Sequence, residues 1–388
     1  MRKFITFGVP NIGKTEIQLL KKTINSKWIG SGPTTEIFEK KFKNYKNSSY
    51  SLSLNSCTAA LHLSLISLGI KKGDEVITTP MTFCSTINSI LLVDAKPVLV
   101  DINPNTFNID ETKIEQKISK RTKAMIIVHF AGLPCNMKPI QKICKKHNIK
   151  LIEDCAHAIE SKYYNKHVGN FGDTGCFSFY ATKNITTGEG GMLTTNNSNI
   201  YKKIRIMRLH GLSKDAWKRY LPDSIDNSNK FQHYDVKEVG LKYNLIDLNS
   251  SLGIPQLEKI EKNLIKRKKL HNFYVQKLKG LPIKFQNIRP YPNKFAHHLF
   301  LIVFDSSKTN KKRDELISFL NKNRIGTGVN YRSVTDMSIY RKKLNWSNKT
   351  CPISKKIGDN ILSLPLYPSL TFAQAKYITN KVSEFFKN

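Results

Sequence analysis

Residues 175–191 read Gly-Cys-Phe-Ser-Phe-Tyr-Ala-Thr-Lys-Asn-Ile-Thr-Thr-Gly-Glu-Gly-Gly. The first part of this stretch is apolar and aromatic, and Phe177, Phe179 and Tyr180 predict a buried β-strand. The polar residues that follow, together with Gly188, favour a loop that faces a ligand. A single lysine, Lys183, is thus expected where a buried strand opens into a loop.

A lysine in such a position can do chemistry that a surface lysine cannot. Removal from water favours the uncharged amine, and only the uncharged amine attacks an aldehyde carbon to form a Schiff base. Most lysines of a folded chain, however, are solvated surface charges. The stretch alone therefore leaves two interpretations of Lys183, a catalytic amine and an ordinary surface charge.

The chain has 388 residues, of which 40% are hydrophobic. This length accommodates two domains with sizeable cores. No apolar run of signal-peptide length follows Met1, and the longest apolar-rich stretch, residues 59–70, is too short to span a bilayer. We therefore expect a cytoplasmic protein with no membrane partner.

The seven cysteines are odd in number, widely spaced and without a C-x-x-C pair. This pattern favours neither a disulfide framework nor a structural zinc site. We expect no bound metal, and we expect reduced, mostly buried thiols at Cys57, Cys84, Cys135, Cys144, Cys155, Cys176 and Cys351.

Basic residues strongly outnumber acidic ones, with 63 Lys and Arg against 29 Asp and Glu and a formal charge of +34. A basic nucleic-acid-binding protein is therefore one alternative. The basic residues, however, form short groups along the whole chain, with no basic tail and no stripe interleaved with aromatic residues. We expect no nucleic-acid partner, since a positive field can equally steer an anionic small substrate.

Residues 8–15, Gly-Val-Pro-Asn-Ile-Gly-Lys-Thr, match the phosphate-binding pattern G-x-x-x-x-G-K-[ST] in full. Residues 4–7 could form a short strand and residues 16–24 a helix, as such a loop requires. Only seven residues precede Gly8, which is few for the buried central strand of a nucleotide hydrolase. A P-loop nucleotide hydrolase that uses Gly8 to Thr15 is the second alternative.

Beyond residue 50 the segments alternate with the rhythm of an α/β domain, which predicts a mostly parallel sheet. Ligands of such sheets gather outside the carboxyl ends of the strands. The expected strands are residues 50–54, 75–78, 97–100, 124–128 and 150–152, and the expected helices are residues 16–24, 35–45, 59–68, 82–91, 109–118 and 137–147.

Two strand ends carry side chains that could bind a ligand. Residues 55–58, Asn-Ser-Cys-Thr, end one strand at the start of a helix, where free N–H groups attract an anion, although plain helix capping needs only one of these residues. Asp154 ends a very apolar strand and favours a cationic partner, with capping as the alternative. His157 follows three residues later and could face the same ligand or serve a structural role.

Several of these motifs occur together in a characteristic order. The chain resembles the DegT/DnrJ/EryC1/StrS family of sugar aminotransferases over nearly its whole length. These are pyridoxal-phosphate (PLP) enzymes of the aspartate-aminotransferase fold, the PLP-dependent transferase fold type I. The likeness rests on residues 55–61 (NSCTAAL), 153–157 (EDCAH), 177–184 (FSFYATKN) and 188–191 (GEGG).

The resemblance implies a role for each residue near the cofactor ring. Lys183 would hold pyridoxal 5'-phosphate as a Schiff base and then carry the proton between substrate and cofactor. Asp154 would pair with the pyridine nitrogen. Phe83 would stack on the ring, and His157 would contact its phenolic oxygen.

The resemblance also implies how the cofactor phosphate is bound. Cys57 and Thr58 would donate backbone N–H groups, and Ser178 would donate its hydroxyl. Asn244 would be supplied by the neighbouring subunit, which implies a homodimer with active sites at the interface. Cys57 departs from the family pattern, in which a smaller residue is usual.

The implied reaction is the transfer of an amino group, with glutamate as donor, to a keto nucleotide sugar for amino-sugar or surface-polysaccharide biosynthesis. Lys183 favours transamination, because the dehydratase branch of the family carries histidine there. Residues 181–189 look more like enzymes that aminate C4 of a 4-keto-6-deoxy sugar than like the C3 group. Asn330 stands where histidine is common, close to the expected sugar site. Trp217, Arg219 and Tyr220 are further substrate-contact candidates.

Beyond residue 265 the sequence changes character. A long helix is expected over residues 255–278, a strand over 299–304, and helices over 313–321 and 372–386. The prediction is a large PLP-binding domain with an N-terminal arm at residues 1–260, and a smaller α+β C-terminal domain at residues 261–388.

Overall fold

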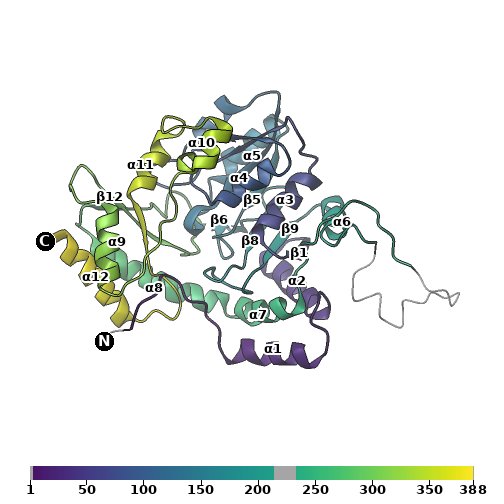
Figure 1. The fold of residues 1–388 in the computed structure, drawn as a ribbon, viewed down its shortest axis with the longest axis horizontal. Helices are drawn as coiled ribbons and strands as arrows, with labels where there is room; N and C mark the ends of the chain where they lie inside the picture. The colour runs from purple at the N-terminus through teal and green to yellow at the C-terminus, as the bar shows by residue number, and fades with distance from the viewer. Residues whose placement is uncertain (1–2, 214–232, 388) are drawn as a thin grey trace.

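The computed structural model describes residues 3–213 and 233–387 (Figure 1). The candidates Trp217, Arg219 and Tyr220 lie outside these residues. The chain ends, as far as they are described, lie on the same side of the molecule, beside α9 (Arg313–Lys322) and α12 (Phe372–Lys387).

A seven-stranded sheet forms the centre of the fold, with strand order β1-β9-β8-β5-β4-β2-β3. Six strands are parallel to one another, and β9 runs antiparallel to both of its neighbours. The predicted α/β fold with a mostly parallel sheet is confirmed. The strands are β1 (Tyr50–Leu54), β2 (Glu75–Thr78), β3 (Lys96–Leu99), β4 (Thr122–Val128), β5 (Lys150–Asp154), β8 (Thr174–Ser178) and β9 (Gly191–Thr195).

Successive side chains of the inner strands enter opposite halves of the core, because a β-strand alternates its faces. In β5, Ile152 packs with the helices α3 and α6, whereas Leu151 packs with α5. Both faces of the sheet are therefore buried, which explains why these strands are apolar throughout. The helices are α3 (Cys57–Ser67), α4 (Cys84–Leu91), α5 (Met137–Lys146) and α6 (Ser198–Met207).

A second sheet of three antiparallel strands, β10-β12-β13, lies in the C-terminal part and packs against α8, α9 and α12. Ile5 of the N-terminal segment joins this apolar cluster and bridges to Ile325. The domain boundary at residue 260 stays a prediction. The strands are β10 (Ile283–Phe285), β12 (Phe300–Phe304) and β13 (Ile361–Leu364), and a small sheet joins β6 (Lys162–Tyr163), β7 (Lys166–His167) and β11 (Asn293–Lys294).

Two expected helices differ from the prediction. Residues 109–118 form two short 3₁₀ turns, Glu111–Lys113 and Glu115–Lys117, because the Asp110 side chain accepts from the Thr112 N–H and hydroxyl and so competes with an α-helical start. The expected helix at 255–278 is in fact two, α7 (Asp247–Glu258) and α8 (Ile260–Leu278), which meet at Lys259. The remaining helices are α1 (Lys14–Asn25), α2 (Pro33–Lys46), α10 (Ser338–Leu344) and α11 (Pro352–Asn360).

The stretch that contains Lys183 also corrects one expectation. β8 ends at Ser178, so Phe179 and Tyr180 already belong to the turn. The turn begins because the N–H of Phe179 bonds to the carbonyl of Gly190, outside the β8–β9 strand pairing, while the N–H of Lys183 folds back to the carbonyl of Tyr180. Lys183 thus lies in a tight turn rather than in an open loop.

The P-loop alternative lacks the structure that it requires. Residues 4–7 form no strand of the central sheet, since Ile5 makes only an isolated bridge. At the start of α1 the N–H of Gly13 donates to the carboxylate of Glu16 at 2.8 Å. Because this carboxylate already occupies the helix N-terminus, the segment is a capped turn and not a phosphate cradle.

All seven cysteines are free thiols, and all but the half-buried Cys84 are buried, as expected. Among the described residues, none of the helices combines the length and the apolar character that crossing a bilayer requires. A cytoplasmic location stays a prediction.

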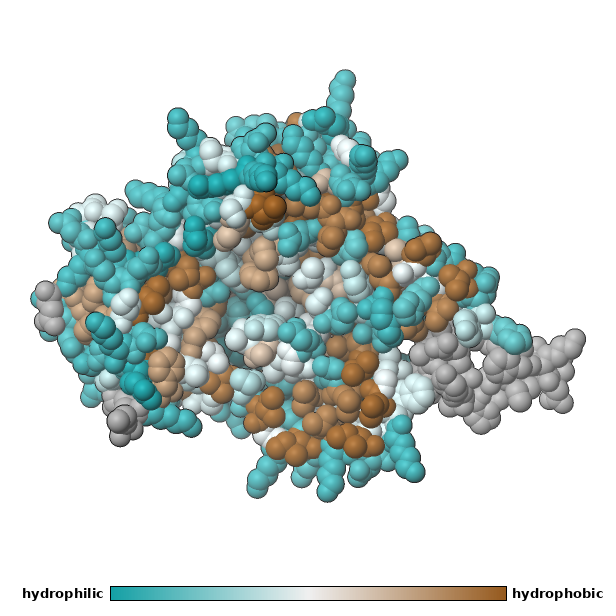
Figure 2. All heavy atoms as spheres, in the orientation of Figure 1, coloured by the Kyte–Doolittle hydropathy of each residue, from teal (hydrophilic) through white to brown (hydrophobic). Residues whose placement is uncertain are grey.

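Hydrophobic side chains gather on the surface at the bottom of Figure 2, over the region where Figure 1 draws α1. The exposed apolar residues of α1 are Ile17 and Ile24, and Ile12 lies just before the helix; their exposed fractions are 61%, 53% and 46%. An exposed apolar patch of this kind is typical of a contact surface for another protein chain.

Asp247 connects the starts of two helices. It is the first residue of α7, and its buried carboxylate accepts from the N–H groups of Gly32, Thr34 and Thr35 at 2.8–3.0 Å and from the Thr35 hydroxyl at 2.6 Å. One side chain therefore satisfies the otherwise unpaired donors at the start of α2.

We predict that Asp247→Ala lowers the free energy of unfolding by about 2–4 kcal/mol, because it leaves several buried N–H donors without a partner. Urea unfolding followed by circular dichroism measures this. Asp314→Ala is the matched control: Asp314 also lies in the first turn of a helix, but its side chain is 77% exposed. Its loss should cost less than about 0.5 kcal/mol; equal losses would contradict the role given to Asp247.

Candidate active site

A cavity of about 490 Å³ opens at the carboxyl ends of the parallel strands, a size typical of small-ligand sites. Its walls come from the ends of β4, β5 and β8, from the start of α3, and from segments near residues 298 and 330. Seven of the eight predicted site residues line it: Cys57, Thr58, Phe83, Asp154, His157, Ser178 and Lys183.

Lys183 extends from the turn after β8 into this cavity. Burial lowers the pKa of its amine to about 8, although the nearby Cys57 and Asp154 oppose this shift. The side chain is therefore a much stronger nucleophile at neutral pH than a solvated lysine.

Asp154 ends β5 and is only 4% exposed. Its carboxylate accepts from the Thr86 hydroxyl at 3.0 Å and from the N–H of Ala156 at 3.1 Å. Burial raises the pKa of this carboxyl, while these two hydrogen bonds and the charge of Lys183 oppose the shift. A cationic group in the cavity would favour the ionised carboxylate.

The start of α3 forms the opposite, anion-binding end of the cavity. Ser56 caps the helix by accepting from the N–H of Ala59 at 3.0 Å, whereas the N–H groups of Cys57 and Thr58 have no hydrogen-bond partner among the described residues. Both residues line the cavity, as does Ser178. Free N–H groups at a helix start are suited to a phosphate.

Gly191 allows this end of the cavity to form. A Cβ atom at this position would lie 2.4 Å from the carbonyl carbon of Ser56 and 2.6 Å from the nitrogen of Cys57. The first residue of β9 therefore has to be glycine, because its backbone passes directly against the turn at the start of α3.

His157 lies in the cavity wall, and its hydrogen bonds fix which ring nitrogen carries the proton. Its Nδ1 accepts from the N–H of Ala131 at 3.2 Å, so in the neutral ring the proton is on Nε2. Burial, together with Lys183 and His298, keeps the pKa of His157 well below its usual range. The N–H at Nε2 donates a hydrogen bond to the hydroxyl oxygen of Tyr331 at 3.1 Å.

Phe83 offers a flat apolar surface at the cavity wall. It directly precedes α4, and 58% of the residue is exposed. The centroid of its ring lies 5.9 Å from the centroid of the Tyr331 ring. An exposed aromatic ring at a cavity wall is suited to stacking on a planar ligand.

The residues Tyr331 and His298 also line the cavity and were not singled out from the sequence, whereas their neighbour Asn330 was. Each lies in a segment without a regular pattern, far along the chain from Lys183. A histidine or tyrosine in an irregular segment carries no periodic signal, so only the fold brings these side chains to the site.

Behind Asp154, a buried carboxylate fixes the end of β5. Glu153 accepts from the N–H groups of Gly169, Phe171 and Gly172 at 2.6–2.8 Å and from Nε2 of His129 at 3.0 Å. His129 uses its Nδ1 to accept from the N–H of Cys135. His129, Glu153 and Cys155 lie close enough to suggest a metal site, but hydrogen bonds already engage both imidazole nitrogens and both carboxylate oxygens.

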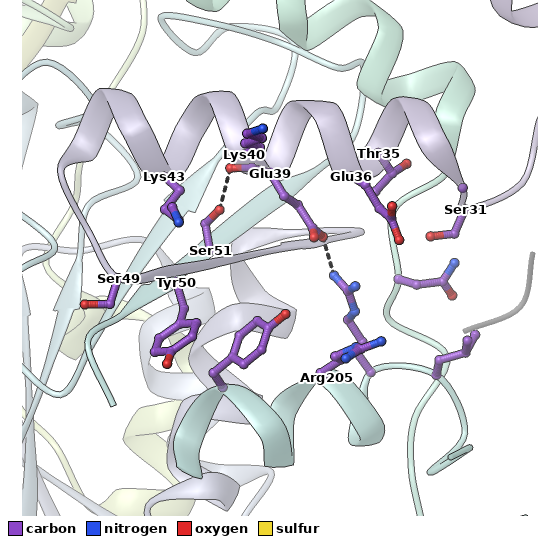
Figure 3. A pocket seen from close by; sticks show the side chains of 15 residues that line it. Ser31, Thr35, Glu36, Glu39, Lys40, Lys43, Ser49, Tyr50, Ser51 and Arg205 are labelled. Atoms are coloured by element: carbon purple, nitrogen blue, oxygen red, sulfur yellow. Dashed lines mark hydrogen bonds and ion pairs between the residues drawn. The ribbon is translucent and has the colours of Figure 1, made fainter. Parts of the chain in front are cut away.

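Asn244 does not line the cavity of its own chain. It lies at a second hollow of about 340 Å³ between α2, β1 and α6 (Figure 3). In this hollow Glu39 accepts from Arg208 at 2.6 Å, and the Ser51 hydroxyl donates to the Glu39 carbonyl at 2.7 Å. The eighth predicted residue is thus separate from the other seven within one chain.

The seven residues together fit one kind of ligand. An anion-binding helix start, a buried carboxylate and a readily deprotonated amine suit a molecule that carries a phosphate, a protonated ring nitrogen and an aldehyde. Pyridoxal 5'-phosphate has these three groups on one aromatic ring.

Known proteins resemble the chain over nearly its whole length. The sequence pattern of the DegT/DnrJ/EryC1/StrS aminotransferase family matches residues 10–383. The uncharacterized protein MJ1066 of Methanocaldococcus jannaschii is 43% identical over 97% of this chain and 96% of its own. The spore coat polysaccharide biosynthesis protein SpsC of Bacillus subtilis is 38% identical over 99% of this chain and 97% of its own.

Solved structures with the same fold include two with nearly complete overlap. Spr1654 of Streptococcus pneumoniae, in its PLP form, has a TM-score of 0.89 and 29% identity over 99% of both chains. PseC of Helicobacter pylori, an aminotransferase involved in the biosynthesis of pseudoaminic acid, has a TM-score of 0.90 and 28% identity over 99% of this chain and 100% of its own. The fold type I prediction is confirmed.

We predict that Lys183 of the cofactor-free protein becomes half-maximally reactive near pH 8, because burial lowers the pKa of its amine to about 8. Competitive acetylation at a series of pH values, read by peptide mass spectrometry, gives this profile. In Asp154→Asn the profile should move to lower pH, since the carboxylate that stabilises the ammonium is lost. A Lys183 that reacts only above about pH 10, as a free lysine does, would contradict the prediction.

Proposed function

Because the chain belongs to the DegT/DnrJ/EryC1/StrS aminotransferase family, whose enzymes depend on pyridoxal 5'-phosphate, we propose that it transfers an amino group from glutamate to a keto nucleotide sugar. The proposed acceptor is C4 of a 4-keto-6-deoxy sugar. The observation that carries the proposal is the presence of Lys183, Asp154 and the start of α3 in one cavity.

In this proposal the cofactor, when bound, accepts the electrons released at the reacting carbon. Asp154 remains ionised against the ring nitrogen, and so keeps that nitrogen protonated. Lys183 would hold the cofactor through Nζ, and after the amino donor has displaced it, the free amine would take up a proton from the cofactor side and pass the same proton to the sugar carbon in the direction of amination. A pKa of about 8 lets the same amine accept and release this proton near neutral pH.

The proposed binding of the phosphate follows from the start of α3. Cys57 and Thr58 donate their unpaired N–H groups, Ser178 donates its hydroxyl, and the helix dipole favours the negative charge. Burial raises the pKa of the Cys57 thiol well above its usual range, so Cys57 adds no competing negative charge.

The proposed assembly is a homodimer in which Asn244 of one subunit contacts the phosphate of the other. It is supported by the position of Asn244 on a separate hollow of its own chain. The exposed apolar patch of α1 also favours contact with another chain.

Two relatives support a sugar substrate for a polysaccharide or amino-sugar pathway: the name of SpsC refers to spore coat polysaccharide, and PseC is involved in pseudoaminic acid biosynthesis. The formal charge of +34 favours a nucleotide sugar in particular, because a positive field attracts its diphosphate. C4 amination and the glutamate donor rest on the resemblance at residues 181–189.

We predict that the purified protein is yellow, that borohydride bleaches it, and that Lys183→Ala prevents borohydride from fixing the cofactor to the chain. Incubation with glutamate and a panel of 4-keto and 3-keto nucleotide sugars, followed by mass spectrometry, should give an amino sugar from a 4-keto-6-deoxy member.

Lys14→Ala serves as the control, because Lys14 belongs to the glycine-lysine pattern but not to the cavity. It should retain colour and turnover. A protein that binds no pyridoxal phosphate, or that hydrolyses ATP in a Lys14-dependent way, would contradict the proposal.

We predict that Lys183→Ala and Asn244→Asp each abolish most activity, and that mixing the two restores about a quarter of it after subunit exchange. Random exchange makes half of the dimers mixed, and each mixed dimer has one intact site of two. Turnover of the mixture, measured with the sugar identified above, tests this. If Asn244 acted within its own chain, mixing would restore nothing.

A further inference from the structure

A second histidine stands against His157 in the cavity wall. The rings of His157 and His298 lie against each other at a tilt, with centroids 4.5 Å apart and planes at 34°. His298 lies two residues before β12, is 7% exposed, and lines the cavity together with Lys183. None of the roles proposed above uses it.

The amide of Asn184 has only one possible orientation. Its Nδ2 donates to Oε2 of Glu160 at 2.7 Å and approaches the carbonyl of Ala296 at 3.4 Å. Both partners can only accept, so Oδ1 of Asn184 has to face the other way. That oxygen lies 2.9 Å from Nδ1 of His298.

Glu160 forms an ion pair with a buried arginine. Arg267, 1% exposed, donates to Oε1 of Glu160 and to the carbonyl of Ala296. Breaking a buried ion pair of this kind leaves an uncompensated charge. The buried ion pair of Arg267 and Glu160 therefore fixes the orientation of the Asn184 amide.

The tautomer of His298 follows from this chain of contacts. Because Oδ1 of Asn184 can only accept, Nδ1 of His298 carries the proton. Burial, with the charges of Lys183 and Arg267, keeps the pKa of His298 well below its usual range, so the ring is neutral. Nε2 then has a free lone pair, and it has no hydrogen-bond partner among the described residues.

The two neighbouring histidines therefore have opposite tautomers. His157 carries its proton on Nε2, because its Nδ1 accepts from the backbone, and this N–H is already donated to the hydroxyl of Tyr331. His298 presents an acceptor at Nε2, because its Nδ1 donates to Asn184. Among the described residues, the acceptor of His298 is therefore the one of these two Nε2 atoms that has no protein partner and is left for a ligand.

We infer that Nε2 of His298 accepts a hydrogen bond from a hydroxyl group of the sugar substrate and so determines which sugars the site accepts. The pair Arg267 and Glu160, acting through Asn184, positions this acceptor. The inference rests on the proposed function, since it requires a sugar in the cavity. A hydroxyl is the matching group, because a sugar ring carries several O–H donors.

The test compares a keto nucleotide sugar with the analogues that lack one ring hydroxyl, at C2 and at C3. The wild-type enzyme should favour the complete sugar over one analogue by about 10- to 100-fold in kcat/KM, because an unpaired buried acceptor is costly. His298→Phe retains the ring but loses the acceptor, and should reduce this ratio to about 1. His298→Gln, whose amide oxygen can accept, should restore part of it.

Two further variants separate specificity from structure. Asn184→Ala frees the His298 ring to place its proton on Nε2, and should lower the ratio in part. His297→Phe makes the same change at the neighbouring buried histidine, which packs on His271 and Phe295 and does not line the cavity. It should leave the ratio at the wild-type value.

All rates are normalised to bound cofactor, measured by its absorbance. A wild-type ratio retained in His298→Phe, with cofactor bound and glutamate turned over, overturns the inference and leaves the proposed function intact. A wild-type protein without cofactor, or without transfer to any keto sugar, overturns both.

Discussion

Partial removal of Lys183 and nearly complete removal of Asp154 from water is the constraint on which the rest of the site depends. Burial favours the uncharged form of each group: it lowers the pKa of the amine and raises that of the carboxyl. The two side chains line one cavity, and the charge of each favours the charged form of the other, which opposes the pKa shift that burial causes. A ligand with a cationic group near the carboxylate and an electrophilic carbon near the amine would stabilise both buried side chains. Pyridoxal 5'-phosphate has both groups.

Two other buried carboxylates hold this arrangement in place, and neither contacts the cavity. Glu153 accepts from three backbone N–H groups and His129, and so fixes the strand end that carries Asp154. Glu160 pairs with Arg267 and fixes Asn184, the residue after Lys183. Both carboxylates are tolerated in the interior because hydrogen bonds satisfy their oxygens. The reacting groups are thus positioned from behind by groups whose own hydrogen bonds are fully used.

The sheet explains why these parts meet. In a parallel sheet all carboxyl ends lie on one edge, so Asp154 after β5, Ser178 at the end of β8 and the turn after β1 converge there. The antiparallel strand β9 lies between β1 and β8, and its first residue, Gly191, allows the start of α3 to come close. Asn244 lies apart from this cavity, so a second chain is the natural source of the eighth proposed contact.

The sequence by itself determined most of the elements and most of the cavity. Apolar strands, helix starts and the motifs around Asp154 and Lys183 are local patterns, and local patterns depend on neighbouring residues. Only the tertiary structure decided the tautomer of His298, because its partner Asn184 is 114 positions away in the chain. It also decided the break at Lys259 and the end of β8 at Ser178. Such features depend on contacts between residues that are far apart in the sequence, and these contacts produce no periodic pattern in it.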